Sequence, residues 1–252
     1  LDELFIKKNN LLNWNESIKK LHETDDAKNI KSRSYRRLVF DEICANFLTL
    51  SENRKRIKKE KTPKIFKTNN SSRILKELPF KLTKSQESVL NEINLDLNNP
   101  RRMFRILQGD VGSGKTIVSF LTIANVLESN YQCALMSPTE ILSLQHFQLA
   151  QKIFEKINIR IEFLTGKTSY SKRKEILKDL AEGKINFLIG THSLFQKKIK
   201  FKNLGYVVID EQHKFGVKQR SDLAKKGGKN CDLLLMSATP IPRTMMMSLY
   251  GD

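Results

Sequence analysis

Six short apolar runs, most of them separated by helical patterns, constrain the fold of this 252-residue chain more than any other feature. They occupy residues 104–108, 133–137, 161–164, 185–190, 206–210 and 232–238. The runs do not alternate between polar and apolar residues, so both faces of each strand are expected to be covered. Helical stretches lie between most of them, for example at residues 116–127 and 141–157. The sequence therefore predicts an α/β fold with a mostly parallel sheet covered by helices on both faces.

The first 77 residues have a different character. After a polar start with a short helical pattern at residues 14–22, apolar residues recur at three- or four-residue steps from Tyr35 to Leu50, which predicts an amphipathic helix with one buried face. A dense basic run follows at residues 53–61, and "KTNNSS" at residues 67–72 indicates a linker. We therefore expect a helical extension over residues 1–77 and an α/β lobe over residues 78–252.

The charge of the chain favours a polyanionic partner. There are 45 Lys and Arg residues against 27 Asp and Glu residues, which gives a net charge of +18. A charge this high is typical of proteins that bind nucleic acid, although a lysine-rich composition that leaves solvated charge everywhere remains the alternative. The basic run at residues 53–61 has the same two readings, a DNA contact or a solvated charge run.

The three cysteines, Cys44, Cys133 and Cys231, are far apart and form no C-x-x-C motif. This spacing argues against a zinc site and against a disulfide framework, and it favours a reducing compartment. No apolar stretch is long enough to span a membrane, and no signal peptide is evident. Because the chain does not begin with Met, we expect it to be a piece of a longer protein.

The segment "GDVGSGKT", from Gly109 to Thr116, matches the phosphate-loop pattern G-x-x-x-x-G-K-[ST] at every fixed position. It follows a predicted strand and opens an apolar helix, which is the context that this motif requires. Glycines let successive backbone N–H groups turn toward one anion, and the helix adds its positive N-terminal end. Lys115 is expected to reach the β- and γ-phosphates, and the Thr116 hydroxyl is expected to bind Mg²⁺. The full set of predicted nucleotide-binding residues in the loop is Gly109, Asp110, Gly112, Ser113, Gly114, Lys115 and Thr116.

Two adjacent acids, Asp210 and Glu211, end the apolar run at residues 206–210. A phosphate loop needs an acidic contact from a neighbouring strand to hold Mg²⁺, so Asp210 is expected on the metal, directly or through water. Glu211 is placed to polarise the attacking water. Taken alone, such a pair of acids more often lies in a solvated loop. The phosphate loop upstream favours the roles at the metal and the water instead. The neighbouring His213 is either a hydrogen-bonded structural histidine or a relay from the nucleotide to another loop.

These motifs together resemble superfamily 2 helicases and translocases, with "DEQH" (Asp210 to His213) as the Walker B box and "SAT" (Ser237 to Thr239) as motif III. "LPFKLTKSQ", "SPTEILSLQH", "GTHSLFQ" and "MSATPIPRTMMMSLYGD" extend the match and look like the RecG-type branch-migration helicases. The resemblance covers roughly residues 30–252. It implies a RecA-like motor lobe that uses ATP and Mg²⁺, in a bacterial, cytoplasmic and monomeric protein that acts on branched or duplex DNA and not on membranes.

Several residue roles follow from the resemblance alone. Gln86 resembles the adenine-reading glutamine, with a helix-capping polar residue as the alternative. Gln212, His213, Ser237 and Thr239 resemble residues that couple hydrolysis to lobe movement. The residues that resemble contacts to the nucleic-acid backbone are Pro138, Thr139, Glu140, Thr165, Gly166, Thr191 and His192. Small hydroxyl residues at helix starts suit phosphate oxygens, and they suit the capping of their own helices equally well.

The same resemblance implies that the whole protein has a second motor lobe, which carries an arginine finger, and a wedge domain. Neither is identified in this sequence, so we expect a fragment of a DNA helicase that remodels stalled forks and Holliday junctions. Two alternatives stay open. In the first, the isolated chain is a nucleotide- and DNA-binding module without turnover of its own. In the second, it is the motor lobe of a transcription-repair coupling translocase.

Overall fold

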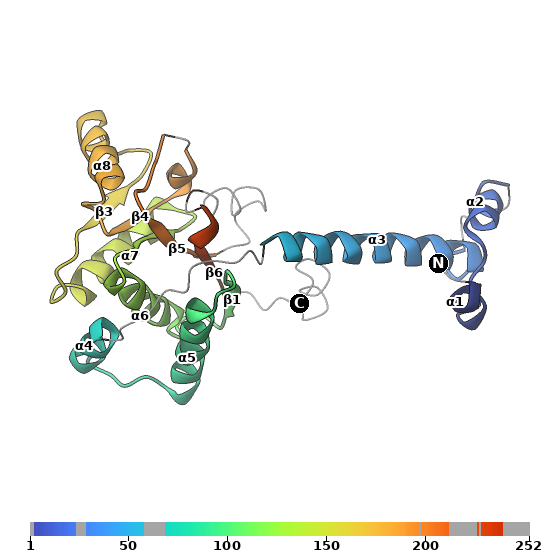
Figure 1. Cartoon of the computed structure of the whole chain (residues 1–252), viewed down its shortest axis with the longest axis horizontal. Helices are drawn as coiled ribbons and strands as arrows, with labels where there is room; N and C mark the ends of the chain where they lie inside the picture. Colours follow the sequence, from blue (N-terminus) through green and yellow to red (C-terminus); the bar gives the residue numbers. More distant parts are fainter. Residues whose placement is uncertain are drawn as a thin grey trace. The chain divides into compact units, whose positions relative to one another are not determined.

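The computed structural model describes residues 3–23, 29–57, 69–196, 198–211, 226 and 228–238. Contacts divide the chain into two compact units, with the division between Arg56 and Ile57. The described part of the first unit is helical and that of the second is α/β (Figure 1). They are called the helical unit and the α/β unit below. Among the described residues no helix is long and apolar enough to cross a membrane.

The helical unit consists, in its described part, of α1 (Glu3–Lys8), α2 (Trp14–Glu23) and α3 (Arg33–Ile57). Arg37 of α3 is 5% exposed and holds the unit together. Its Nε donates to Asp41 Oδ2 at 2.8 Å, and its Nη1 donates to the Leu12 carbonyl oxygen at 2.8 Å. The rings of Phe5 and Phe40 lie 5.4 Å apart, so α1 also packs on the first half of α3.

The two helices expected in this unit are present, but the expectation that α3 buries one apolar face is wrong beyond Leu38. Val39, Ile43 and Phe47 continue the apolar pattern, yet they are 37%, 49% and 44% exposed. The hydrogen bonds and the ring contact from α1 and the segment after it reach α3 at Arg33, Arg37 and Phe40, on its first turns. The periodicity of a helix shows which face is apolar, but not whether a neighbour covers it.

The α/β unit is built on a six-stranded sheet with the strand order β1-β6-β5-β2-β4-β3. All neighbouring strands in it are parallel. The strands are β1 (Phe104–Gln108), β2 (Gln132–Met136), β3 (Ile161–Leu164), β4 (Phe187–Gly190), β5 (Leu204–Ile209) and β6 (Asp232–Ser237). Each apolar run of the sequence forms one of these strands, with ends that shift by two residues at most. The predicted α/β class is confirmed.

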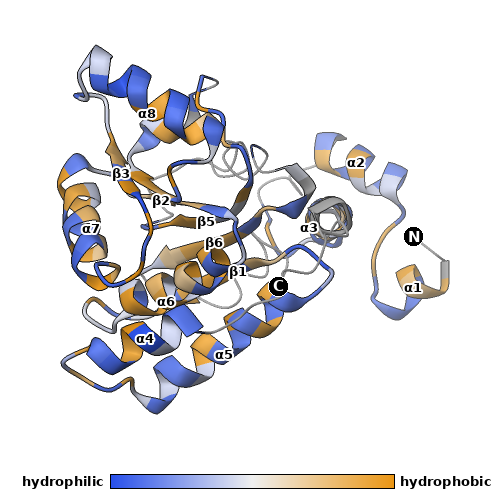
Figure 2. Cartoon of the chain, turned by 60° about the vertical axis from the view of Figure 1, so that its left-hand side comes forward, coloured by the Kyte–Doolittle hydropathy of each residue, from blue (hydrophilic) through white to orange (hydrophobic). Residues whose placement is uncertain are grey.

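Helices cover both faces of the sheet, as the non-alternating strands predict. The helices of this unit are α4 (Asn69–Glu77), α5 (Lys84–Asn98), α6 (Lys115–Glu128), α7 (Glu140–Ile153) and α8 (Tyr170–Glu182). Along β2, Cys133 and Leu135 pack in a core with α5, α6 and α7, whereas Ala134 and Met136 pack in a second core with α8. Figure 2 shows the apolar sides of these helices turned toward the sheet.

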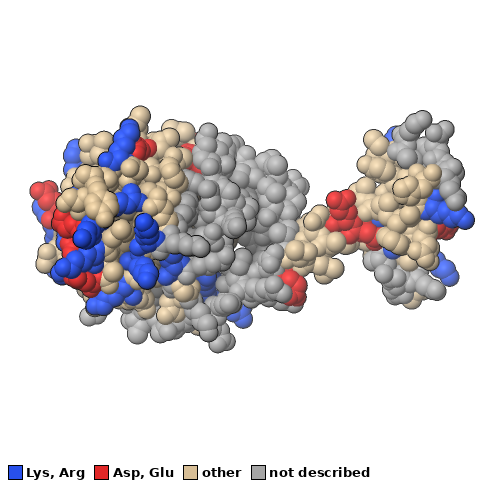
Figure 3. Space-filling view, turned by 90° about the horizontal axis from the view of Figure 1, so that it is seen from above, with Lys and Arg blue, Asp and Glu red and all other residues tan. Residues whose placement is uncertain are grey.

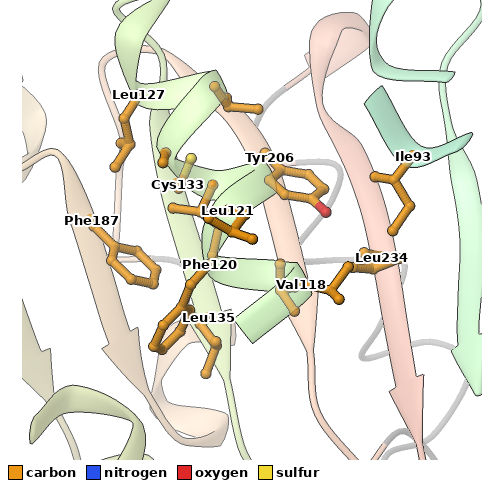
Figure 4. Packing of buried hydrophobic residues seen from close by; sticks show 14 of the residues in the cluster. Ile93, Val118, Phe120, Leu121, Leu127, Cys133, Leu135, Phe187, Tyr206 and Leu234 are labelled. Atoms are coloured by element: carbon orange, nitrogen blue, oxygen red, sulfur yellow. The ribbon is translucent and has the colours of Figure 1, made fainter. Parts of the chain in front are cut away.

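Helix α6, which follows the phosphate loop, is buried on all sides from Ile117 to Leu127. A helix that is buried and mostly apolar all round belongs in a core, and α6 lies between the sheet and the helices α4 and α5. Figure 4 shows Phe120 and Leu121 of α6 beside Leu135 and Tyr206 of the strands. The start of α6 is therefore held rigidly at the carboxyl edge of the sheet.

Residues 69–72 were expected in a linker, but they form the first turn of α4. The Glu128 carboxylate at the end of α6 accepts hydrogen bonds from Asn69 Nδ2 at 2.9 Å and from the Asn70 backbone N–H at 3.1 Å. A carboxylate at a helix N-terminus satisfies orphan N–H groups and complements the helix dipole. Because the acceptor comes from a distant segment, the local sequence does not show it. These contacts place α4 with the α/β unit.

Candidate functional site

The phosphate loop lies between the end of β1 and the start of α6. Gly112 and Gly114 adopt left-handed backbone angles, with φ of 81° and 83°, which glycine tolerates far better than other residues. A Cβ at Gly114 would overlap the side-chain amide of Gln86, and a Cβ at Gly109 would overlap the Ser113 hydroxyl. The loop therefore has the shape and the bare backbone that a phosphate cradle needs, and it fits the nucleotide that the motif predicts.

Lys115 folds back into this loop. Its ammonium group donates to the carbonyl oxygens of Gly109 at 2.6 Å and of Asp110 at 2.8 Å. A cation at the centre of the loop marks the place where negative charge is favoured. The β- and γ-phosphates of a nucleotide would compete with these two carbonyl groups for the ammonium.

Gln86 lies at the other side of the loop and makes the contacts of a helix cap. The Thr83 hydroxyl accepts from the Gln86 backbone N–H at 3.2 Å, and Gln86 Oε1 accepts from the Thr83 backbone N–H at 2.9 Å. This is a capping box at the start of α5. Gln86 Nε2 also donates to the Ser113 carbonyl oxygen at 2.9 Å. The capping alternative is thus present in the structure, and the adenine-reading role stays a prediction.

The two acids follow β5 directly. The Asp210 backbone N–H donates to the Met136 carbonyl oxygen at 2.8 Å, so the strand pairing of β5 with β2 continues to this residue. Asp210 Oδ1 accepts from the Glu211 backbone N–H at 2.9 Å. Glu211 has a φ of 49°, a left-handed conformation that is uncommon for a residue with a side chain. Residues with strained backbone of this kind cluster at active sites and ligand-binding sites.

His146 of α7 is a member of this site that the sequence reasoning missed. Its Nε2 lies 2.8 Å from Asp210 Oδ2, and the two side chains are 10% and 13% exposed. The ring also packs edge-on against Phe120 of α6, with 6.4 Å between the ring centres. His146 lies on the buried face of α7 with Ser143 and Ala150, and its place in "SPTEILSLQH" was the available signal.

Ser237 connects motif III to the phosphate loop. Its carbonyl oxygen accepts from the Gly109 backbone N–H at 3.3 Å, because the pairing of β6 with β1 continues into the start of the loop. The Ser237 side chain is buried. The other three predicted coupling residues, Gln212, His213 and Thr239, lie outside the described residues.

The predicted contacts to nucleic acid follow β2, β3 and β4 at the carboxyl edge of the sheet, and two of them, Glu140 and His192, are the first residues of helices. Pro138 is half-buried, and the exposed Thr139 uses its hydroxyl to accept from the Leu142 N–H at 3.2 Å, so it caps α7. The Glu140 carboxylate pairs with Lys167 at 3.0 Å, and this hydrogen bond lowers the pKa of Glu140. An acid paired in this way is less repulsive to a phosphate.

In the other two loops the side chains divide between the interior and the surface. Thr165 and Thr191 are 4% and 2% exposed, whereas Gly166 and His192 are exposed. The Thr165 hydroxyl accepts from the Lys167 backbone N–H at 3.3 Å and so shapes its own turn. Of these four residues, Gly166 and His192 lie at the surface of the two loops, and Thr165 and Thr191 lie beneath it.

Within the described residues, His, Cys, Asp and Glu form no group of three or more that could hold a metal ion unaided. The predicted donors are the Thr116 hydroxyl, in the first turn of α6, and the Asp210 carboxylate, directly after β5. Two oxygen donors fit Mg²⁺, which keeps several waters and takes further ligands from nucleotide phosphates.

Comparisons with known proteins agree with this geometry. The sequence profile of the DEAD/DEAH box helicase family matches residues 83–247. The chain is 46% identical over 242 residues to the ATP-dependent DNA helicase RecG of Aquifex aeolicus, covering 93% of this chain and 31% of that protein. It is 41% identical over 255 residues to the RecG protein of Bacillus subtilis, covering 100% of this chain and 37% of that protein.

A solved structure of RecG bound to a three-way DNA junction superposes on the whole chain and on 34% of the RecG chain, with a TM-score of 0.81 and 38% identity. The helicase MrfA bound to DNA matches 77% of the chain with a TM-score of 0.58 at 18% identity, which shows a shared fold alone. The chain thus spans about a third of the length of these RecG relatives. From the matched profile and the phosphate-loop geometry together, the chain belongs to the DEAD/DEAH box helicase family and resembles its RecG-type members.

Proposed function

We propose that this chain is the ATP-binding motor lobe of a helicase that hydrolyses ATP to move along duplex DNA and to remodel branched DNA, such as stalled forks and four-way junctions. The observation that carries the proposal is the meeting of three segments at one edge of the sheet. The phosphate loop is hydrogen-bonded to the end of β6 through Gly109 and Ser237, and Asp210 and Glu211 directly follow β5, which is the next strand. The RecG relatives, named ATP-dependent DNA helicases, support this reading.

Each residue of the edge has a defined task in the proposed reaction. The backbone N–H groups of the loop and the N-terminus of α6 receive the phosphates. Lys115 exchanges its two carbonyl partners for the β- and γ-phosphates, and Glu211 orients the attacking water. Thr116 and Asp210 hold Mg²⁺, which when bound supplies charge neutralisation on the phosphates. These side chains position and stabilise charge, which is most of what phosphoryl transfer asks of a protein.

The proposed polymer surface is the set of loops after β2, β3 and β4. Contacts there would be to phosphates and sugars, so binding is expected to be independent of sequence and to weaken with salt. Figure 3 shows Lys and Arg side chains over the face of the α/β unit in view, with Asp and Glu side chains among them. The net charge of +18 favours the same class of ligand. That the RecG structure contains a three-way junction supports branched DNA as the partner.

The proposal includes two partners outside the described lobe, a second motor lobe and a wedge domain. A second lobe would bring the arginine that stabilises the transferred phosphoryl group, and such fingers are worth about 10³–10⁵-fold in rate in GTPases. The alternative function is therefore a nucleotide- and DNA-binding module with negligible turnover by this chain alone. A transcription-repair translocase is the other alternative, and the RecG relatives favour it less.

The first test is nucleotide binding by Lys115→Ala. We expect the wild-type chain to bind a fluorescent ATP analogue in the presence of Mg²⁺ and Lys115→Ala to lose this binding, because the phosphates lose their main cationic partner. Lys84→Ala is the matched control, since Lys84 is exposed and also begins a helix. Unchanged affinity in Lys115→Ala would refute the assignment of the phosphate loop.

The second test separates hydrolysis from binding with Glu211→Gln, which keeps the size of the side chain and removes its charge. In the whole protein we expect retained ATP binding and a loss of turnover by about 10²-fold or more, because the water loses its orienting base. Glu155→Gln, at an exposed position beyond the end of α7, is the control. Robust turnover by this 252-residue chain alone, stimulated by branched DNA, would reject the module alternative.

A further inference from the structure

The Asp210 carboxylate is held by the chain at both of its oxygens. Oδ1 accepts from the Glu211 backbone N–H at 2.9 Å, and Oδ2 lies 2.8 Å from His146 Nε2. An ionised carboxylate is an acceptor only, so the ring nitrogen that faces it carries the hydrogen. The His146 side chain is 10% exposed, so water competes little for this bond. One rotamer of Asp210 is thereby selected before any ligand arrives.

The other contacts of His146 connect this bond to the phosphate loop. Its ring packs edge-on against Phe120, with an interplanar angle of 71°. Phe120 is buried in α6, about one helical turn after Thr116. The imidazole thus touches the helix that carries Thr116 on one side and bonds Asp210 on the other. Thr116 and Asp210 are the two side chains that hold Mg²⁺ in the proposed function.

We propose that His146 is a positioning residue for the Mg²⁺ site, acting through Asp210. The inference rests on the proposed function, because it takes Asp210 to be the metal-side acid. Carboxylates that bind metals are themselves oriented by hydrogen bonds, and loss of such an outer partner typically costs about 10–100-fold in metal affinity or activity. His146 fixes the direction of Asp210 relative to α6, so that the carboxylate does not have to be ordered when the ion binds.

A histidine that only fills space would have different requirements. For packing against Phe120 an apolar side chain of similar size would serve, and the bond to Asp210 would merely satisfy two polar groups. The two roles differ in what a substitution changes. Loss of packing lowers stability under all conditions, whereas loss of positioning changes the response to Mg²⁺ in particular.

The experiment compares His146→Leu with His146→Gln in this chain. The amide nitrogen of Gln reaches about as far as Nε2 and donates a hydrogen bond, whereas Leu keeps apolar volume without a donor. Affinity for a fluorescent ATP analogue is measured in EDTA and across a Mg²⁺ titration, and Mn²⁺ binding to the nucleotide complex is followed by EPR. Thermal unfolding reports the fold of each variant. His22→Leu, an exposed histidine of α2, is the matched control.

We expect His146→Leu to leave affinity in EDTA unchanged and to raise the Mg²⁺ concentration of half-maximal effect by about 10–100-fold. His146→Gln is expected to have a Mg²⁺ concentration of half-maximal effect within about threefold of wild type, because the hydrogen bond to Asp210 is restored. If His146→Leu does not fold, His146→Asn takes its place, because its shorter amide does not reach Asp210. The proposal would be overturned if His146→Leu, or His146→Asn in its place, had the wild-type Mg²⁺ concentration of half-maximal effect. It would also be overturned if that variant and His146→Gln had the same Mg²⁺ concentration of half-maximal effect.

Asp210→Asn separates a failure of this inference from a failure of the proposed function. If Asp210→Asn raises the Mg²⁺ concentration of half-maximal effect and His146→Leu does not, only the role of His146 is rejected. If Asp210→Asn has the wild-type Mg²⁺ concentration of half-maximal effect, the assignment of Asp210 to the metal is rejected. The positioning role of His146 is then rejected as well.

Discussion

Gln86 Nε2 donates a hydrogen bond to the Ser113 carbonyl oxygen at 2.9 Å and so joins the first turn of α5 to the phosphate loop. The other half of the same amide, Oε1, accepts from the Thr83 N–H within the capping box. Both halves of the amide therefore have partners inside the chain. To read adenine, Gln86 would exchange at least one of these partners for the base, which would link base recognition to the conformation of the loop.

Replacing Gln86 with Ala is expected to lower affinity for ATP more than affinity for GTP, because the amide that distinguishes the two bases is lost. Competition binding against a fluorescent nucleotide measures both affinities. Thr83→Ala is the matched control, since it disrupts the same capping box at a cost of about 1 kcal/mol but leaves the Gln86 amide. An equal loss for both nucleotides in Gln86→Ala would show that Gln86 acts as a cap alone.

Replacing Gly114 with Ala should abolish nucleotide binding and lower stability. Its φ of 83° costs a residue with a Cβ roughly 1–2 kcal/mol, and the new methyl group would also displace Gln86. Gly228→Ala is the control, because Gly228 has a φ of 64° but open space where the Cβ would be. Chemical denaturation and nucleotide titration check the two effects. Normal nucleotide affinity in Gly114→Ala would contradict the role of the loop geometry.

The buried hydroxyl of Tyr206 should stabilise the core through Thr122. Thr122 Oγ1 donates to the Ser119 carbonyl oxygen at 2.8 Å, so Tyr206 is the donor in its 3.1 Å bond to Thr122. Burial raises the pKa of Tyr206, and the phenol stays neutral. Tyr206→Phe is expected to cost about 0.5–1.5 kcal/mol in urea unfolding. A double-mutant cycle with Thr122→Val measures the coupling between the two side chains. If the losses in free energy of unfolding are additive, the bond contributes nothing.

Asp179 should make the stability of the α/β unit depend on acid pH. The hydrogen bond from Arg160 Nη1, at 2.5 Å, lowers the pKa of Asp179. A carboxylate with a depressed pKa stabilises the fold above its unfolded pKa of about 3.9, and this contribution disappears as pH falls through the lower folded pKa.

Asp179→Asn is therefore expected to lower the midpoint of thermal unfolding by a constant amount above about pH 5, and the gap to wild type should close in stronger acid. Thermal unfolding from pH 7 to pH 2 measures the gap. Glu87→Gln, at an exposed position of α5, serves as the comparison. A gap that persists unchanged at the lowest pH would show that the ion pair with Arg160 is not its cause.

The sequence was sufficient where the information lies within a few residues. Runs of apolar residues without alternation specify buried parallel strands, and each predicted run forms a strand of the sheet. The phosphate-loop pattern predicts glycines that let the backbone N–H groups turn toward one anion, and the structure has left-handed backbone at Gly112 and Gly114. Asp210 was placed correctly at a strand end because an apolar run followed by an acid is a local pattern.

The sequence was insufficient where a contact joins distant segments. Residues 69–72 have the composition of a linker, and they are helical because Glu128 caps them from the end of α6. The apolar stripe of α3 predicted a buried face, but residues such as Ile43 and Phe47 are exposed. Helical periodicity specifies an amphipathic surface, and only the packing of other elements determines whether that surface is covered.

By itself, then, the sequence determined the fold class, the phosphate loop and the two acids, since propensity, glycine geometry and strand burial all act over short distances along the chain. Only the tertiary structure decided that His146 bonds Asp210, that Gln86 bonds Ser113 and that Ser237 meets Gly109. Each of these pairs joins different elements, which only the folded chain brings together. A hydrogen bond depends on distance and direction in space, and neither is encoded in local residue spacing.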